Sequence, residues 1–172
     1  VPLEYPGLSN DLTFPIFLPY ILGERGVLWN NQATGMLFGL RERHERNDIA
    51  RAVYEGVAFS LRQILERIRS LGIQVDKLIS GSANDMPAWS QLRADIYGSP
   101  INFPGQRNVT GLGAAMLGLV GIQAFSSLES AAQHCTSIRE TDKVSPITAM
   151  TTHYNRQWAR YEAIVSTVDQ LF

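Results

Sequence analysis

The 172-residue sequence is poor in the features that mark several broad classes of protein. It has one cysteine, so Cys135 cannot form an internal disulfide, and no metal-ligating residue lies near it at a useful spacing. A net charge of −1 offers no basic field for nucleic acid or for a membrane surface. The uncharged apolar run at residues 109–125 is short for a membrane span and contains four glycines, which favours a buried helix. We therefore expect a cytoplasmic, globular protein that binds neither nucleic acid nor membrane.

Several motifs of known chemistry are also missing. There is no Gly-x4-Gly-Lys-Ser/Thr loop, and the segment 81–85 lacks the second glycine of a Gly-x-Ser-x-Gly elbow. Residues 111–116 match a dinucleotide-binding fingerprint only in part, because Met116 stands where glycine or alanine is needed. The three histidines are too far apart for a zinc site. Because Glu24, Asp85 and Asp95 have no evident partner that would shift a pKa, we predict no catalytic residue and no metal site in this chain.

A short apolar run, residues 75–79, leads into a cluster of small residues that begins at Ser80 and ends at Met86. Pro87 then opens a helical pattern that continues through Tyr97. Small side chains let backbone N–H groups approach an anion, and the N-terminus of the following helix carries partial positive charge. This order indicates a phosphate-binding turn, and the alternative is an ordinary strand-to-helix turn in which Gly81 eases the bend.

Strand and helix patterns alternate along the rest of the chain. The longest helix is expected from an N-cap at Asn47 to Leu71, with apolar residues at helical spacing and Gly72 as its stop. Gly56 in its middle indicates that another backbone comes close. Strands are expected at 14–21, 36–40 and 101–103, and further helices at 110–122, 126–132 and 153–171. The alternation predicts an α/β fold with a central sheet covered by helices.

Three polar positions between or within these elements allow more specific expectations. Glu24 and Arg25 form a charged pair in a turn, which is either solvated or a buried ion pair at a domain junction. His44 is expected to form hydrogen bonds rather than to bind a metal. Asp95 is expected opposite the inward face of the helix at 87–97, or at the edge of that face.

Several stretches of the chain occur together in a recognisable order. They include Gly23-Glu24-Arg25 and the helical segment Arg51-Ala52-Val53-Tyr54-Glu55-Gly56-Val57-Ala58-Phe59. The others are residues 17–20, 29–35, 38–40, 44, 78–83, 89, 94–101, 112–115 and the aromatic positions 154, 158 and 161. In order and spacing, over nearly the whole chain, these stretches resemble the C-terminal domain of the FGGY family of carbohydrate kinases, in the branch with xylulose and gluconate kinases.

The resemblance implies an actin-like, ribonuclease H-like α/β domain in a two-domain, hinged kinase that uses ATP and Mg²⁺ to phosphorylate a sugar or sugar acid. Residues 1–172 would form a single domain, most of the C-terminal, nucleotide-side domain. The chain begins with Val1 rather than methionine, and we expect a piece of a longer protein whose N-terminal sugar-binding domain is absent. The catalytic aspartate and most sugar contacts would belong to that domain, so the chain alone is expected to be inactive. Whether it forms a homodimer stays open.

The nucleotide contacts implied by the family fall in the turn after the predicted strand. Ser80, Gly81, Ser82 and Ala83 would lie against the phosphates of ATP or ADP, and the segment from Asn84 to Met86 would border the adenosine. Most relatives carry more glycine here, as Gly-Gly-Gly-Ala or Gly-Gly-Ala. The two serines therefore leave a second reading open, a non-catalytic actin-like module with a regulatory or interaction role. A dinucleotide-binding oxidoreductase is a weaker third reading, which Met116 disfavours.

Overall fold

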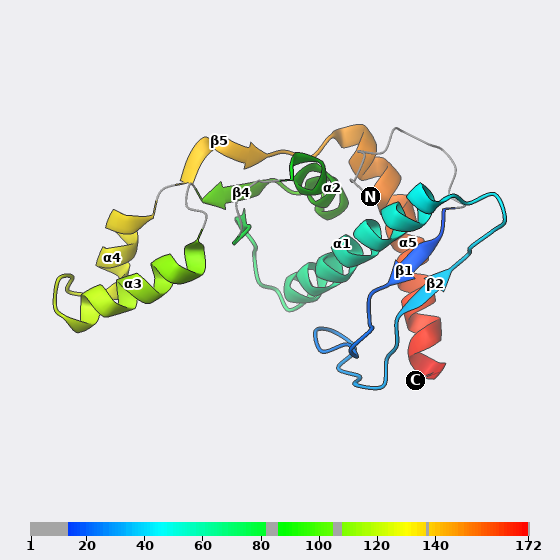
Figure 1. Cartoon of the computed structure of the whole chain (residues 1–172), viewed down its shortest axis with the longest axis horizontal. Helices are drawn as coiled ribbons and strands as arrows, with labels where there is room; N and C mark the ends of the chain where they lie inside the picture. Colours follow the sequence, from blue (N-terminus) through cyan, green and yellow to red (C-terminus); the bar gives the residue numbers. More distant parts are fainter. Residues whose placement is uncertain (1–13, 82–85, 105–107, 137, 172) are drawn as a thin grey trace.

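The computed structural model describes residues 14–81, 86–104, 108–136 and 138–171 (Figure 1). The elements follow one another as β1 (Ile16–Leu18), β2 (Met36–Phe38), α1 (Arg46–Ser70), β3 (Leu78–Ile79), α2 (Pro87–Tyr97), β4 (Ile101–Pro104), α3 (Val109–Gly121), α4 (Leu128–Cys135), β5 (Ile138–Val144), α5 (Thr148–Val168) and the 3₁₀ helix η1 (Asp169–Leu171). No helix in these ranges is both long and apolar enough to cross a membrane.

The strands form two small sheets. β1 pairs with β2 in antiparallel register, Ile16 opposite Phe38. In the second sheet, of order β3-β4-β5, β3 and β4 are parallel and β5 is antiparallel to β4. The strand predicted at 75–79 shortens to β3 and lies at the edge of this sheet within the described residues, not at its centre. β5 was not predicted at all.

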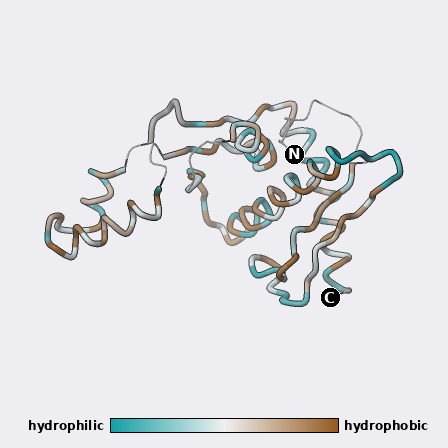
Figure 2. The backbone as a smooth tube through the Cα atoms, in the orientation of Figure 1, coloured by the Kyte–Doolittle hydropathy of each residue, from teal (hydrophilic) through white to brown (hydrophobic). Residues whose placement is uncertain are grey.

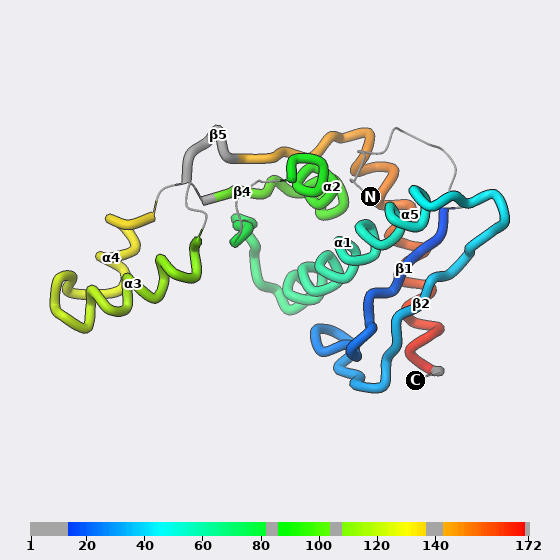
Figure 3. Tube along the Cα trace, viewed as in Figure 1, coloured from blue at the N-terminus to red at the C-terminus, as the bar shows by residue number. Residues whose placement is uncertain are grey.

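The main core lies where α1, α2 and α5 meet β1. Phe59 of α1 packs against Tyr154, Trp158 and Tyr161 of α5, with ring centroids 5.3–6.2 Å apart. Figure 3 shows the blue N-terminal strands close to the red C-terminal helix, and the Tyr20 and Tyr161 hydroxyls are 3.1 Å apart. The aromatic stripe predicted on the last helix is therefore confirmed as core, although α5 begins at Thr148, earlier than predicted.

The predicted helix at α1 is confirmed, but its N-cap is not Asn47. Glu45 occupies the N-cap, and its backbone N–H donates to the Asp48 carboxylate at 2.8 Å. This capping box, in which the N-cap backbone bonds to an acid three residues further on, starts the helix two residues earlier than an N-cap at Asn47 would. At the other end, Gly72 adopts φ +79 after Leu71, as a stop residue should.

Gly56 is where α1 meets β1. A Cβ at this position would overlap the carbonyl oxygen of Phe17, so the helix and the strand approach closely only because the side chain is absent. This confirms the expectation drawn from a glycine in mid-helix. Prediction and structure also agree at His44, whose Nδ1 accepts a hydrogen bond from the Arg41 N–H at 2.9 Å.

α3 and α4 form a hairpin that projects from the second sheet (Figure 1). Figure 2 shows hydrophobic residues along α3, yet α3 has no buried residue, and Ala131 is the buried residue of α4. The expectation of a buried helix packed through its glycines is therefore wrong in this structure: a Cβ on Gly113, Gly118 or Gly121 would meet no described atom within 4 Å.

Candidate functional site

The end of β3 is fixed by hydrogen bonds to β4. The Ser80 N–H donates to the carbonyl of Asn102 at 3.0 Å, which extends the parallel ladder one residue past β3. The Asn102 side chain donates in turn to the carbonyl of Leu78 at 3.0 Å. Ser80 and Asn102 are both buried. The chain thus leaves the sheet from a defined point, at the carboxyl end of a strand, where ligands of open α/β sheets commonly bind.

Gly81 follows at that point and is exposed. Its φ is not positive, so its backbone conformation does not require glycine. A Cβ built there would meet Val109 Cγ2 at 3.5 Å among the described atoms, which is ordinary van der Waals contact. Neither backbone strain nor packing within the described chain explains the missing side chain. The space that it leaves faces the start of α3.

α2 begins on the far side of the turn. Met86 occupies its N-cap and is exposed, and it has no oxygen in its side chain that could accept from the first-turn N–H groups. Pro87 is the first helical residue and carries no N–H itself. The predicted helix bounds, 87–97, are confirmed. Of the six predicted nucleotide contacts, Ser80, Gly81 and Met86 are described, whereas Ser82, Ala83 and Asn84 lie outside the described residues.

Arg93 is a neighbour of the turn that the sequence analysis missed. Its Nη1 donates to Ser80 Oγ at 3.4 Å, and its guanidinium lies over the rings of Trp89 and Phe103 at 5.2 and 5.9 Å. Burial lowers the pKa of Arg93, opposed by Tyr97, and no carboxylate among the described residues pairs with it. The signal was available: Arg93 shares a face of α2 with Trp89 and Tyr97, one turn away on either side.

The three candidate carboxylates do not form a catalytic group. Glu24 is buried, but it accepts hydrogen bonds from the backbone N–H groups of residues 26–29, while Arg25 is exposed and donates to Asn31. Neither alternative predicted for this turn is therefore correct. Asp95 is fully buried and accepts from the Ile147 N–H at 2.6 Å, which fastens α2 to the start of α5. Asp95 was expected opposite the inward face of α2 or at the edge of that face, whereas its side chain is completely buried. Asp85 lies outside the described residues.

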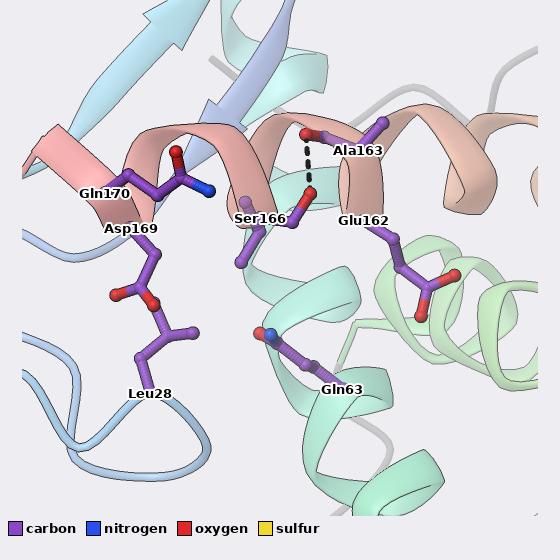
Figure 4. A pocket seen from close by; sticks show the side chains of 8 residues that line it. Leu28, Gln63, Glu162, Ala163, Ser166, Asp169 and Gln170 are labelled. Atoms are coloured by element: carbon purple, nitrogen blue, oxygen red, sulfur yellow. Dashed lines mark hydrogen bonds between the residues drawn. The ribbon is translucent and has the colours of Figure 1, made fainter.

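A pocket of about 560 Å³ lies elsewhere, between the loop at Leu28, α1 and the end of α5. Figure 4 shows Glu162 and Asp169 at its wall beside Gln63, and Ser166 Oγ donates to the Ala163 carbonyl at 3.0 Å. Two acidic side chains disfavour a phosphate, and none of the lining residues belongs to the turn after β3. Among the described residues, no three His, Cys, Asp or Glu side chains are grouped to hold a metal ion.

Comparison with solved structures identifies the class of protein to which this fold belongs. The crystal structure of a xylulose kinase from Brucella ovis matches 99% of this chain and 34% of that chain, with a TM-score of 0.79 and 27% sequence identity. A Plasmodium falciparum glycerol kinase solved with ADP shares the fold, with a TM-score of 0.64 at 23% identity over 90% of this chain and 31% of that chain. The fold is thus the actin-like, ribonuclease H-like α/β fold of sugar kinases, as predicted.

The sequence comparisons are more specific. The family described as "FGGY family of carbohydrate kinases, C-terminal domain" matches residues 6–122. The xylulose kinase of Bacillus subtilis is 31% identical over 159 residues, which cover 91% of this chain and 31% of that protein. This chain belongs to the FGGY family of carbohydrate kinases. It spans about a third of the length of the curated relatives that it matches.

Proposed function

We propose that this chain supplies the nucleotide side of an ATP-dependent carbohydrate kinase, as most of the C-terminal domain of a two-domain protein. The observation that carries the proposal is Gly81, a glycine that neither its φ nor its packing among the described residues requires. A ligand that needs the space is a physical reason for a glycine at this position, at the carboxyl end of a strand. The family membership of the chain supplies the chemical class of that ligand.

The surroundings of Gly81 suit a phosphate chain. The first-turn N–H groups of α2 and the partial positive charge of its N-terminus favour an anion. The Arg93 guanidinium lies behind Ser80 and adds a full positive charge that no described carboxylate neutralises. In this proposal Ser80, Gly81, Ser82 and Ala83 contact the phosphates of ATP or ADP, and Asn84 and Met86 border the adenosine. The ADP bound to the Plasmodium falciparum glycerol kinase is consistent with that ligand.

The reaction we propose for the complete protein moves the γ-phosphoryl group of ATP to a hydroxyl of a sugar or sugar acid. Such transfers depend chiefly on positioning and on stabilising the charge of the transferred group. This chain would hold the nucleotide, and the sugar and the catalytic base would be held by the N-terminal domain. The described residues offer no cluster for Mg²⁺, which typically binds through nucleotide phosphates, a few carboxylates and water. Because the sugar and the catalytic base would lie on the N-terminal domain, we expect no sugar-dependent ADP formation from the 172-residue chain alone.

Titration of the chain with Mg-ADP, followed by amide NMR, tests the nucleotide site. We expect shifts to cluster at Ser80, Gly81 and Met86, and we expect them to vanish in the Gly81→Val variant. Gly113→Val is the matched control, because a Cβ at Gly113 meets no described atom and should leave binding unchanged.

Shifts that are absent, or that gather at the pocket beside Glu162 instead, would contradict the proposed site. A Gly81→Val variant with unchanged affinity would remove the turn from it. Absent shifts would also revive the reading of the chain as a non-catalytic actin-like module.

A further inference from the structure

Arg93 lies in the second turn of α2, and its side chain is half-buried. Because helical side chains lean toward the N-terminus of their helix, its guanidinium lies over the ring of Trp89, one turn earlier, at 5.2 Å. The ring of Phe103, from β4, is 5.9 Å away. These contacts bring the guanidinium to the end of β3, where its Nη1 donates to Ser80 Oγ at 3.4 Å.

The guanidinium has more hydrogen-bond donors than the described chain uses. An arginine side chain carries a planar fork of N–H donors and no acceptor. Among the described residues, Arg93 uses one of these donors, in its hydrogen bond to Ser80. Its Nε is buried and has no hydrogen-bond partner there. A charged group with unpaired donors is costly to bury, so the position of Arg93 calls for a physical reason.

Two arginines of α1 with similar burial have the partner that Arg93 lacks. Arg51 Nε is 2.6 Å from a carboxylate oxygen of Glu55, and Arg62 Nε is 3.6 Å from one of Glu66. The described part of the chain offers Arg93 no carboxylate of this kind. An anion bound in the adjacent turn would supply the missing negative charge, and a nucleotide phosphate is such an anion.

We propose that Arg93 is a positioning residue of the nucleotide site, which holds Ser80 at the end of β3 and gives the turn its preference for a phosphate chain over an uncharged ligand. The inference rests on the proposed function of the turn. The guanidinium stays charged at neutral pH, because arginine is not deprotonated in proteins. Its effect on a bound phosphate is strong at short range in a partly buried place and weakens as salt screens it.

A purely structural role is the alternative. The stem of an arginine covers apolar surface, and Arg93 lies against two aromatic rings, so it would then serve to close the contact between α2 and the sheet. Loss of packing would weaken the binding of every ligand of the turn alike. Loss of a charge that favours phosphate would weaken only the binding of ligands that carry phosphate.

Replacement of the charge separates the two roles. We would measure dissociation constants of Mg-ADP and of adenosine for the 172-residue chain by amide NMR. Arg93→Gln keeps a donor for Ser80 and removes the charge, and we expect it to weaken Mg-ADP binding about tenfold and adenosine binding less than about twofold. Arg93→Lys keeps the charge and should bind Mg-ADP within about threefold of the wild-type chain. Mg-ADP binding should also depend less on added NaCl in Arg93→Gln.

Two further variants complete the set. Arg67→Gln is the matched control, because it removes the same charge from an exposed position in the last turn of α1 and should leave both dissociation constants unchanged. Arg93→Met keeps an apolar side chain over the two rings. It should show the same selective loss of Mg-ADP binding, and it serves as the charge-free variant if Arg93→Gln does not fold in urea denaturation.

Equal weakening of Mg-ADP and adenosine in the charge-free variants would overturn the proposal, because Arg93 would then act through packing alone. Unchanged Mg-ADP affinity in these variants would overturn it as well, and so would an Arg93→Lys variant as weak as Arg93→Gln. A wild-type chain that does not bind Mg-ADP would contradict the proposed function itself and this inference with it. That failure is seen before any variant is made, so the two are distinguishable.

Discussion

The core around α1 and α5 and the α3–α4 hairpin bury their apolar residues to very different extents (Figure 1). In the core, Leu92, Ile96 and Tyr154 are fully buried. In the hairpin, α3 contains no charged residue and yet no buried one, and Leu117 is 63% exposed. An apolar sequence therefore does not ensure burial, because burial needs a second surface that matches it. The helices of the core have that surface within this chain, and α3 does not among the described residues.

Truncation of one leucine in each region should give the largest difference. Leu92→Ala removes a fully buried side chain of α2 and should lower the free energy of unfolding by about 3 kcal/mol, through lost transfer energy and a cavity. Leu117→Ala on α3 should change it by less than about 0.5 kcal/mol. Urea denaturation of both variants checks this. Equal losses would show that the hairpin is packed in solution and would remove the contrast.

Glycine substitutions should change stability in opposite directions in the two regions. At Gly56 a Cβ would overlap the Phe17 carbonyl oxygen, so Gly56→Ala should lower the free energy of unfolding by about 2 kcal/mol as α1 and β1 move apart. At Gly113 nothing described lies within 4 Å, and Gly113→Ala should stabilise the helix by about 1 kcal/mol. Circular dichroism during urea unfolding measures both. A stabilised Gly56→Ala variant would contradict the close approach of β1.

Much of the core could be predicted from sequence because its signals are local. The stop at Gly72, the close approach at Gly56 and the bounds of α2 follow from the backbone needs of single residues. The exposure of α3 and the choice of the buried face of α1 could not be predicted, because they depend on which surfaces the rest of the chain provides. Aliphatic residues of α1 such as Val53, Val57 and Leu61 fit the helical pattern well and yet are 36–43% exposed. The buried residues of the helix are Ala52, Glu55, Gly56, Ala58, Phe59 and Leu65.

The candidate site also has a part that the sequence could predict and a part that it could not. The strand, small-residue turn and helix start were predicted in their order, since all three are contiguous in sequence. Helical spacing could have placed Arg93 on the same face of α2 as Trp89 and Tyr97, but its contact with Ser80 arises from the way α2 folds back on the sheet. The burial of Asp95 was missed because its partner, Ile147, is 52 residues away. Hydrogen bonds between distant elements leave no periodic pattern to detect.

The smallest effect concerns the buried tyrosines Tyr20, Tyr154 and Tyr161 of the core, since α3 and α4 contain no tyrosine. Burial raises the pKa of Tyr20 from 10.0 to about 12, against the opposing effect of its hydrogen bond to Tyr161. The folded state therefore keeps a proton that the unfolded state loses near pH 10, and stability present below that pH is lost as the pH rises toward 12. Burial also raises the pKa of Tyr97 to about 12, so more than one tyrosine contributes.

Replacing Tyr20 by phenylalanine should make the loss of stability between pH 10 and 12 shallower, because one of the groups with a raised pKa is gone. It should also cost about 1 kcal/mol at pH 8, through the lost hydrogen bonds to Gln63 and Tyr161. Urea midpoints at pH 8, 10 and 11.5 separate the two effects. An unchanged slope would mean that the Tyr20 hydroxyl is hydrated in solution. The segment after β1 would then pack on α5 less tightly than the burial of Tyr20 indicates, and the contrast between core and hairpin would be weaker.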